Sequence, residues 1–124
     1  MAVTKNAGRQ TPLVATVDLT AAMIPAVAVY EAVDLPPGAI VTGGTLEVTT
    51  TDAGGGTIKV QVGSDVLLAA TATNAAIQTF FTQGAAKVAA GDTVDVEVET
   101  AVLTTFAGRL IVQYIIDGRA TEVN

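Results

Sequence analysis

The chain has 124 residues, a formal net charge of −6 and a sequence pI of about 4.2. This length suits one domain with a core of its own. The six basic residues are scattered rather than clustered, so the acidic chain repels phosphate backbones and nucleic acid is not expected as a partner. No apolar run approaches the roughly 18 residues of a spanning helix, so no membrane partner is expected either.

The composition also limits the core and the chemistry. Alanine and valine make up roughly a third of the residues, whereas aromatic residues make up only 4%. Such small side chains suit two thin packed sheets, or a domain that buries part of its apolar surface against a second subunit. The sequence contains no cysteine and no histidine, which removes Ser–His and Cys–His nucleophile pairs and most zinc ligand sets. We therefore expect no enzyme activity, no cofactor and no metal.

Short apolar or alternating segments recur along the chain, separated by turn residues. The segments expected as strands are, in chain order, residues 13–19, 26–34, 40–50, 57–62, 65–73, 75–82, 93–100 and 108–116. About eight strands with almost no helix predict an all-β domain, either a β-sandwich or a barrel. Eight strands in this length suit a jelly roll, although periodicity alone does not distinguish it from an immunoglobulin-like topology.

Three parts of the chain are expected to behave differently. Residues 1–12 are polar and are interpreted as an extended N-terminal arm. Residues 13–118 hold all the expected strands and form a single β-sandwich domain. Residues 119–124 are a polar C-terminal tail.

A hard corner divides residues 26–51. Pro36 and Pro37 fix φ and lack backbone donors, and Gly38 can adopt a positive φ. We expect this corner to move the chain from one sheet to the other rather than to make a tight hairpin. Residues 26–34 are apolar on both faces, which predicts a central strand covered on both sides. The pair Gly43-Gly44 predicts a bulge or a close backbone approach in the following strand.

Two glycine-containing segments punctuate the middle of the chain. Residues 51–56 include three consecutive glycines and are interpreted as a flexible loop without a core-forming residue. No Lys-Ser or Lys-Thr follows these glycines, so a phosphate cradle is not expected. Gly63-Ser64 directly follows an alternating segment and predicts a two-residue hairpin turn.

One acidic row stands out in residues 93–100. Asp95, Glu97 and Glu99 alternate with valines, so they share one face of a strand. A straight strand spreads its carboxylates, whereas calcium needs six or more converging oxygens. We interpret the row as a solvated face that discourages edge-to-edge pairing. A carboxylate-based hydrolase is a weaker alternative.

Aromatic and apolar positions supply the candidates for a subunit or partner interface. Adjacent strand residues point to opposite faces, so one of Phe80 and Phe81 is expected in the core and the other at the surface. Residues 108–116 are apolar on both faces, which indicates either a buried subunit contact or a doubly covered central strand. The interface candidates are Leu13, Phe80, Phe81, Phe106, Leu110, Val112 and Tyr114.

Three segments carry a family resemblance. YEAVDLPPGAIVTGGTLEVTT, KVQVGS and GRLIVQYIIDGRATEVN occur in this order. Together they resemble segments of small virion structural proteins encoded by tailed bacteriophages and prophages. The resemblance covers roughly residues 27–123, and the region around residues 63–65 is shorter than the family pattern.

The resemblance implies a capsid decoration or cement protein with a jelly-roll fold. Such a protein binds and stabilises the outer capsid surface as a homotrimer, with the major capsid protein as its partner. It is made in the host bacterial cytoplasm and resides on the virion, and it carries no catalytic residue. The alternative is a glycan- or receptor-binding β-sandwich module of a tail fibre or adhesin, against which the scarcity of aromatic residues argues.

Overall fold

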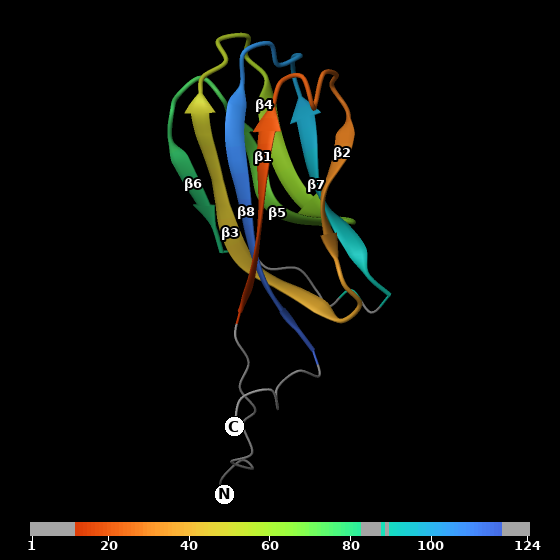
Figure 1. Cartoon of the computed structure of the whole chain (residues 1–124). Coiled ribbons are helices and arrows are strands. Elements are labelled where there is room, and N and C mark those ends of the chain that lie inside the picture. Colours follow the sequence, from red (N-terminus) through yellow and green to blue (C-terminus); the bar gives the residue numbers. More distant parts are fainter. Residues whose placement is uncertain (1–11, 83–87, 89, 118–124) are drawn as a thin grey trace, which may run out of the picture.

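The computed structural model describes residues 12–82, 88 and 90–117, and these ranges contain eight strands (Figure 1). The strands are β1 (Leu13–Thr20), β2 (Val29–Leu35), β3 (Ala39–Thr50), β4 (Thr57–Val62), β5 (Asp65–Ala72), β6 (Gln78–Phe81), β7 (Asp92–Glu99) and β8 (Ala107–Ile116). Within the described ranges, no helix is long and apolar enough to cross a membrane.

The strands form two four-stranded antiparallel sheets. Sheet I has the order β1-β8-β3-β6 and sheet II has the order β2-β7-β4-β5. The pairing is nested, because β1 pairs with β8, β2 with β7, β3 with β6 and β4 with β5. This is the pattern of one long hairpin rolled up so that its strands divide between two sheets, which is the jelly roll. The predicted all-β, eight-stranded, jelly-roll-like sandwich is therefore confirmed.

The proline corner behaves as predicted. β2 ends at Leu35 in sheet II, and β3 begins at Ala39 in sheet I, so the corner carries the chain between the sheets. Gly38 has φ +85°, a left-handed conformation that side chains disfavour. The predicted irregularity near Gly43 is also present, because the β3–β8 register shifts between Val41 and Gly43.

The predicted central position of residues 26–34 is wrong. β2 lies at the edge of sheet II, paired only with β7, and Val29 is 48% exposed. Its register also shifts between Glu31 and Val33. Val27, just before β2, is 53% exposed as well. Apolar residues on both faces of a segment therefore did not indicate that both faces are covered.

The inward side chains of both sheets form one continuous core. Its members with 0% exposure are small or medium aliphatic residues: Ile58, Val60, Val94, Val96, Val98, Leu110 and Val112. The alternation of β7 is clear, since its valines point inward and its acidic residues outward. At a typical 25 cal/mol per Å² of buried apolar area, such a core depends on many small contributions.

Parts of the expected organisation lie outside the described residues. Residues 1–11 of the expected arm and all of the expected tail, residues 119–124, belong to them. Residues 83–87 and 89 also lie outside them, whereas Val88 is described and bridges to Ala39.

Candidate interaction surfaces

Four of the seven interface candidates lie inside the chain's own core. Phe81 is 5% exposed, Phe106 2%, and Leu110 and Val112 0%. Their burial comes from the packing of the two sheets against each other. In the folded chain these side chains offer almost no area to a partner.

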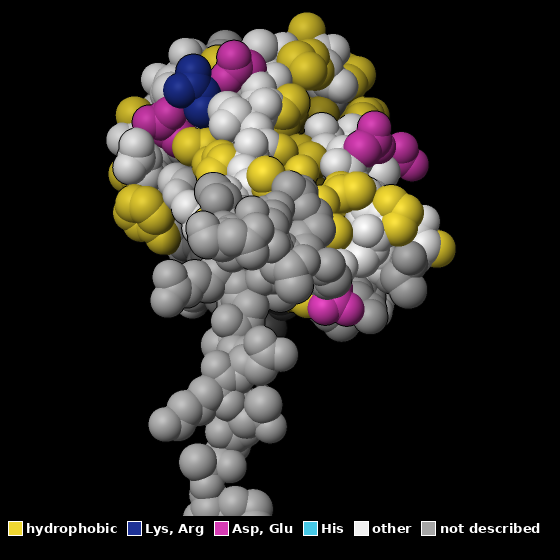
Figure 2. All heavy atoms as spheres, turned by 60° about the horizontal axis from the view of Figure 1, so that its bottom comes forward, with side chains coloured by type: hydrophobic (Ala, Val, Ile, Leu, Met, Phe, Trp, Pro, Cys, Tyr) yellow, Lys and Arg dark blue, Asp and Glu magenta, His cyan; other side chains and the backbone are white. Residues whose placement is uncertain are grey.

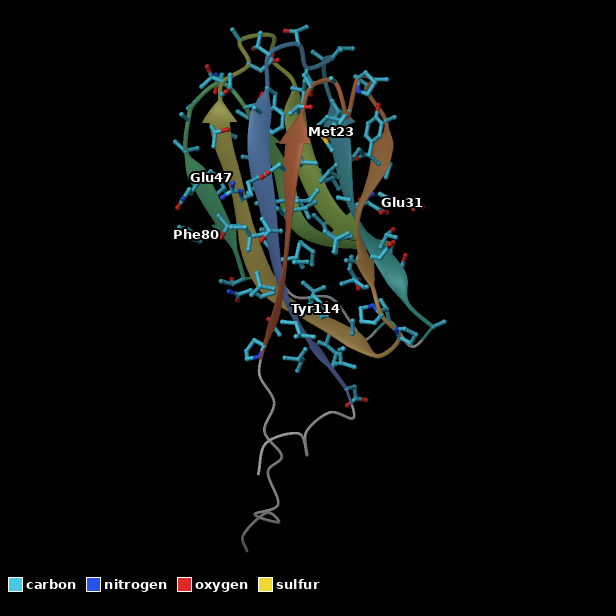
Figure 3. All side chains as sticks on the ribbon, in the orientation of Figure 1. Met23, Glu31, Glu47, Phe80 and Tyr114 are labelled. Carbon is cyan, nitrogen blue, oxygen red and sulfur yellow. The ribbon has the colours of Figure 1, made fainter. Side chains whose placement is uncertain are left out.

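Leu13 and Tyr114 are brought together. They face each other across the β1–β8 pair and are both half-buried. Tyr114 also pairs with Val41, which is 2% exposed, so this row points into the sandwich. Figure 3 places Tyr114 at the lower end of the sandwich. We call this pair the Leu13–Tyr114 end.

The surface around this end mixes apolar and acidic side chains. Figure 2 turns the lower end forward and shows hydrophobic side chains exposed between acidic ones. Val14 follows Leu13 in β1 and points to the outer face of the sheet, where it is 57% exposed. The end therefore presents apolar area beyond the inward row itself.

Phe80 lies apart from this pair. It belongs to β6, at the opposite edge of sheet I from β1, and it is 71% exposed (Figure 3). The prediction that Phe80 and Phe81 divide between core and surface is confirmed. On the outer face, Phe80 continues a cross-strand row that runs from Thr16 through Ile111 and Thr45.

A polar row runs beside the Phe80 row. The Arg109 Nε donates to Asp18 Oδ1 at 2.9 Å, and the Gln78 amide donates to Glu47 Oε2 at 2.8 Å. Arg109 and Glu47 are themselves cross-strand neighbours. The hydrogen bond to Asp18 raises the pKa of Arg109. This row therefore sets one guanidinium against two carboxylates and carries a net charge of −1.

The outer face of sheet II is acidic. Lys59 Nζ lies 3.7 Å from Glu97 Oε2 and 4.0 Å from Glu99 Oε1, so one ammonium group forms ion pairs with two carboxylates. A side-chain hydrogen bond with Glu97 is the main cause that raises the pKa of Glu99. β7 is a central strand between β2 and β4, so the prediction that its acidic row protects a sheet edge is wrong. In the described part of the chain, no group of three or more acidic side chains is arranged to hold a metal ion.

An apolar opening separates the edge strands β1 and β2. It has a volume of about 170 Å³ and is lined by Val17, Leu19, Met23, Ile24, Tyr30 and Glu31, among others. The Tyr30 hydroxyl fixes one wall, because it accepts from the Ala26 amide at 2.8 Å and donates to the Ala26 carbonyl at 3.1 Å. Figure 3 shows Met23 near the upper end of this region and Glu31 on the β2 side.

Asp52 is the residue that sequence reasoning missed. It lies in the loop described as lacking a core residue, yet it is 0% exposed. Its carboxylate accepts from the amides of Gly54 at 2.8 Å, Thr104 at 2.6 Å and Thr105 at 2.8 Å. These hydrogen bonds tie the β3–β4 loop to the β7–β8 loop. An aspartate two residues before a glycine is typical of a turn in which the carboxylate accepts from the backbone. This pattern was the sequence signal that could have identified Asp52.

The fold is shared with a solved phage structure. A chain in the acidic stable capsid structure of Helicobacter pylori bacteriophage KHP30 is similar to this chain with a TM-score of 0.61 and 20% sequence identity. The similarity covers 85% of this chain and 87% of that chain. At this identity the likeness shows the fold alone. No protein-family model and no curated protein matches the sequence.

Proposed function

We propose that this chain is a non-enzymatic structural protein of a bacteriophage virion, a decoration or cement protein that binds and stabilises the outer capsid surface. The observation that carries the proposal is the jelly roll, shared over most of both chains with a component of a phage capsid structure. The resemblance of three segments to small phage virion proteins supports it from the sequence. A decoration protein needs contact surfaces and no catalytic residues, which agrees with a chain that has no histidine and no cysteine.

The proposal includes assembly as a homotrimer, with the Leu13–Tyr114 end as a subunit contact. This end has half-buried apolar side chains that a neighbour would cover, next to the exposed Val14. Burial of such side chains on association is worth roughly 25 cal/mol per Å² before the cost of association. The remaining surface of the trimer would contact the major capsid protein.

Light scattering coupled to size-exclusion chromatography tests the trimer. A mass three times the chain's 12.5 kDa is expected at micromolar concentration. The double variant Leu13→Ser/Tyr114→Ser should shift the mass toward the monomer. A matched control, Val66→Ser, changes an apolar residue that is 39% exposed on β5 in the other sheet, and it should remain a trimer. A wild-type monomer would refute the assembly.

Co-sedimentation with capsids of the phage or prophage that encodes the chain tests the virion role. The protein should sediment with the capsids and should raise their resistance to heat. Deleting residues 1–10 should weaken this attachment more than it lowers the stability of the domain. Failure of the full-length chain to sediment would contradict the role, and equal attachment of the truncated chain would contradict a part for the arm.

A further inference from the structure

A hollow of about 240 Å³ opens beside Phe80 on the β6 side of sheet I. It arises where β6 stops, because β6 pairs only with the Gly44–Glu47 stretch of β3. Its floor is the Gly43-Gly44 backbone, which has no side chain to fill the space. A Cβ at Gly43 would lie 2.9 Å from the Phe81 carbonyl oxygen, so only glycine fits this floor.

The side chains around the hollow are neutral, and they combine two phenylalanines, the exposed Phe80 and the buried Phe81, with hydrogen-bonding groups. Its wall includes Phe80, Thr42, Thr45, Thr82 and Gln113. The Gln113 amide offers both donors and an acceptor, and the hydroxyls of Thr45 and Thr82 offer both as well. The Thr42 hydroxyl already donates to the backbone carbonyl of Gln113 at 3.2 Å, so it offers a ligand an acceptor only.

We propose that the Phe80 hollow binds one neutral sugar ring. A pyranose has an apolar C–H face, which stacks on the negative face of an aromatic ring. Its hydroxyls need neutral groups that both donate and accept, which Thr45, Thr82 and Gln113 supply. No lining residue is charged, and the chain's net charge of −6 disfavours anionic ligands.

The size and exposure of the hollow set its affinity and its access. Typical sites for drug-sized ligands have about 300–1,000 Å³, so this hollow takes a single ring rather than an oligosaccharide. Phe80 is 71% exposed, so the ring is reachable without rearrangement of the core. A dissociation constant on the order of 1 to 10 mM is expected for so small a ligand. The proposal rests on the lining of the hollow and not on the proposed capsid role.

Nuclear magnetic resonance on the ¹⁵N-labelled full chain tests the site, with D-glucose, D-galactose and N-acetyl-D-glucosamine as probes. At least one of them should cause saturable shifts in the amides of Gly43, Gly44 and Thr45. Phe80→Ala should weaken binding at least fivefold, and its amide spectrum reports directly whether it is folded. Sodium D-glucuronate should bind more weakly than D-glucose.

Ile77→Ala is the matched control. Ile77 is 49% exposed and precedes β6, but it does not line the hollow, so its variant should bind the sugar as the wild type does. Three results would overturn the site: no saturable shift with any probe, shifts centred elsewhere, or equal binding by Phe80→Ala. Loss of capsid co-sedimentation in Phe80→Ala without any sugar binding by the wild type would instead assign the hollow to a protein contact.

Discussion

Replacing Asp52 by asparagine tests whether one buried carboxylate holds two loops of the sandwich together. The carboxylate accepts three backbone amide hydrogen bonds from two different loops, at 2.6 to 2.8 Å. Asparagine has nearly the same shape but only one acceptor oxygen, and its amide group would face backbone donors. The substitution therefore removes the charge and leaves at least one buried donor without a partner.

The size of the effect follows from the pKa of Asp52. The amides of Thr105, Thr104 and Gly54, in that order, lower this pKa from 3.8 to about 2, and burial opposes them. Since one pKa unit corresponds to about 1.4 kcal/mol, the ionised form adds about 2.5 kcal/mol to the free energy of unfolding at neutral pH. An unsatisfied buried donor costs about 1–3 kcal/mol. We expect Asp52→Asn to lose about 2–3 kcal/mol at pH 7.

Urea denaturation as a function of pH provides the assay. Because the pKa is lower in the folded state, this stabilisation is fully present above pH 3.8 and is lost as the pH falls through about 2. The difference between the wild type and Asp52→Asn should therefore be constant from pH 7 to about pH 4 and should shrink below it. Measurements at one protein concentration keep any contribution from association equal.

Asp34→Asn is the matched control. Asp34 is exposed at the end of β2, and the same change of charge there should stay within about 0.5 kcal/mol. The reasoning would be refuted if Asp52→Asn were as stable as this control at pH 7. A stability difference that did not change between pH 5 and pH 2 would refute the role assigned to the ionised form.

Four further substitutions have expected outcomes in the same denaturation assay. Gly44→Ala would place a Cβ against a β8 carbonyl oxygen and the Phe81 ring, so it should lower the free energy of unfolding by about 3 kcal/mol or more. In Gly55→Ala the new Cβ meets open space, and only the φ of +82° is unfavourable, so the loss should be about 1–2 kcal/mol. Ile58→Ala empties a site that is 0% exposed and should cost about 2–5 kcal/mol; a loss below 1 kcal/mol would contradict its place in the core. Arg109→Ala breaks an ion pair whose side chains are 49% and 74% exposed, so a loss above about 1 kcal/mol at low salt would be unexpected.

Several local features could be predicted from the residues alone. Alternating valines and acids predicted β7, Gly63-Ser64 predicted the β4–β5 turn, and the proline corner predicted the transfer between sheets. These features depend on interactions between residues close together in the chain, such as fixed φ angles, missing donors and the two-residue period of a strand. The class of fold followed from their number and spacing.

The sequence by itself therefore determined about eight strands and an all-β sandwich or barrel, whereas the tertiary structure decided which strand lies beside which and hence that the fold is a jelly roll. Periodicity shows which side chains share a face, but it does not identify the neighbour that covers that face. For this reason β2 was expected at the centre and is found at an edge, and Leu110 and Val112 were expected at an interface and are buried. Asp52 was missed for the same reason, because two of its amide partners, Thr104 and Thr105, are more than fifty positions away in the chain.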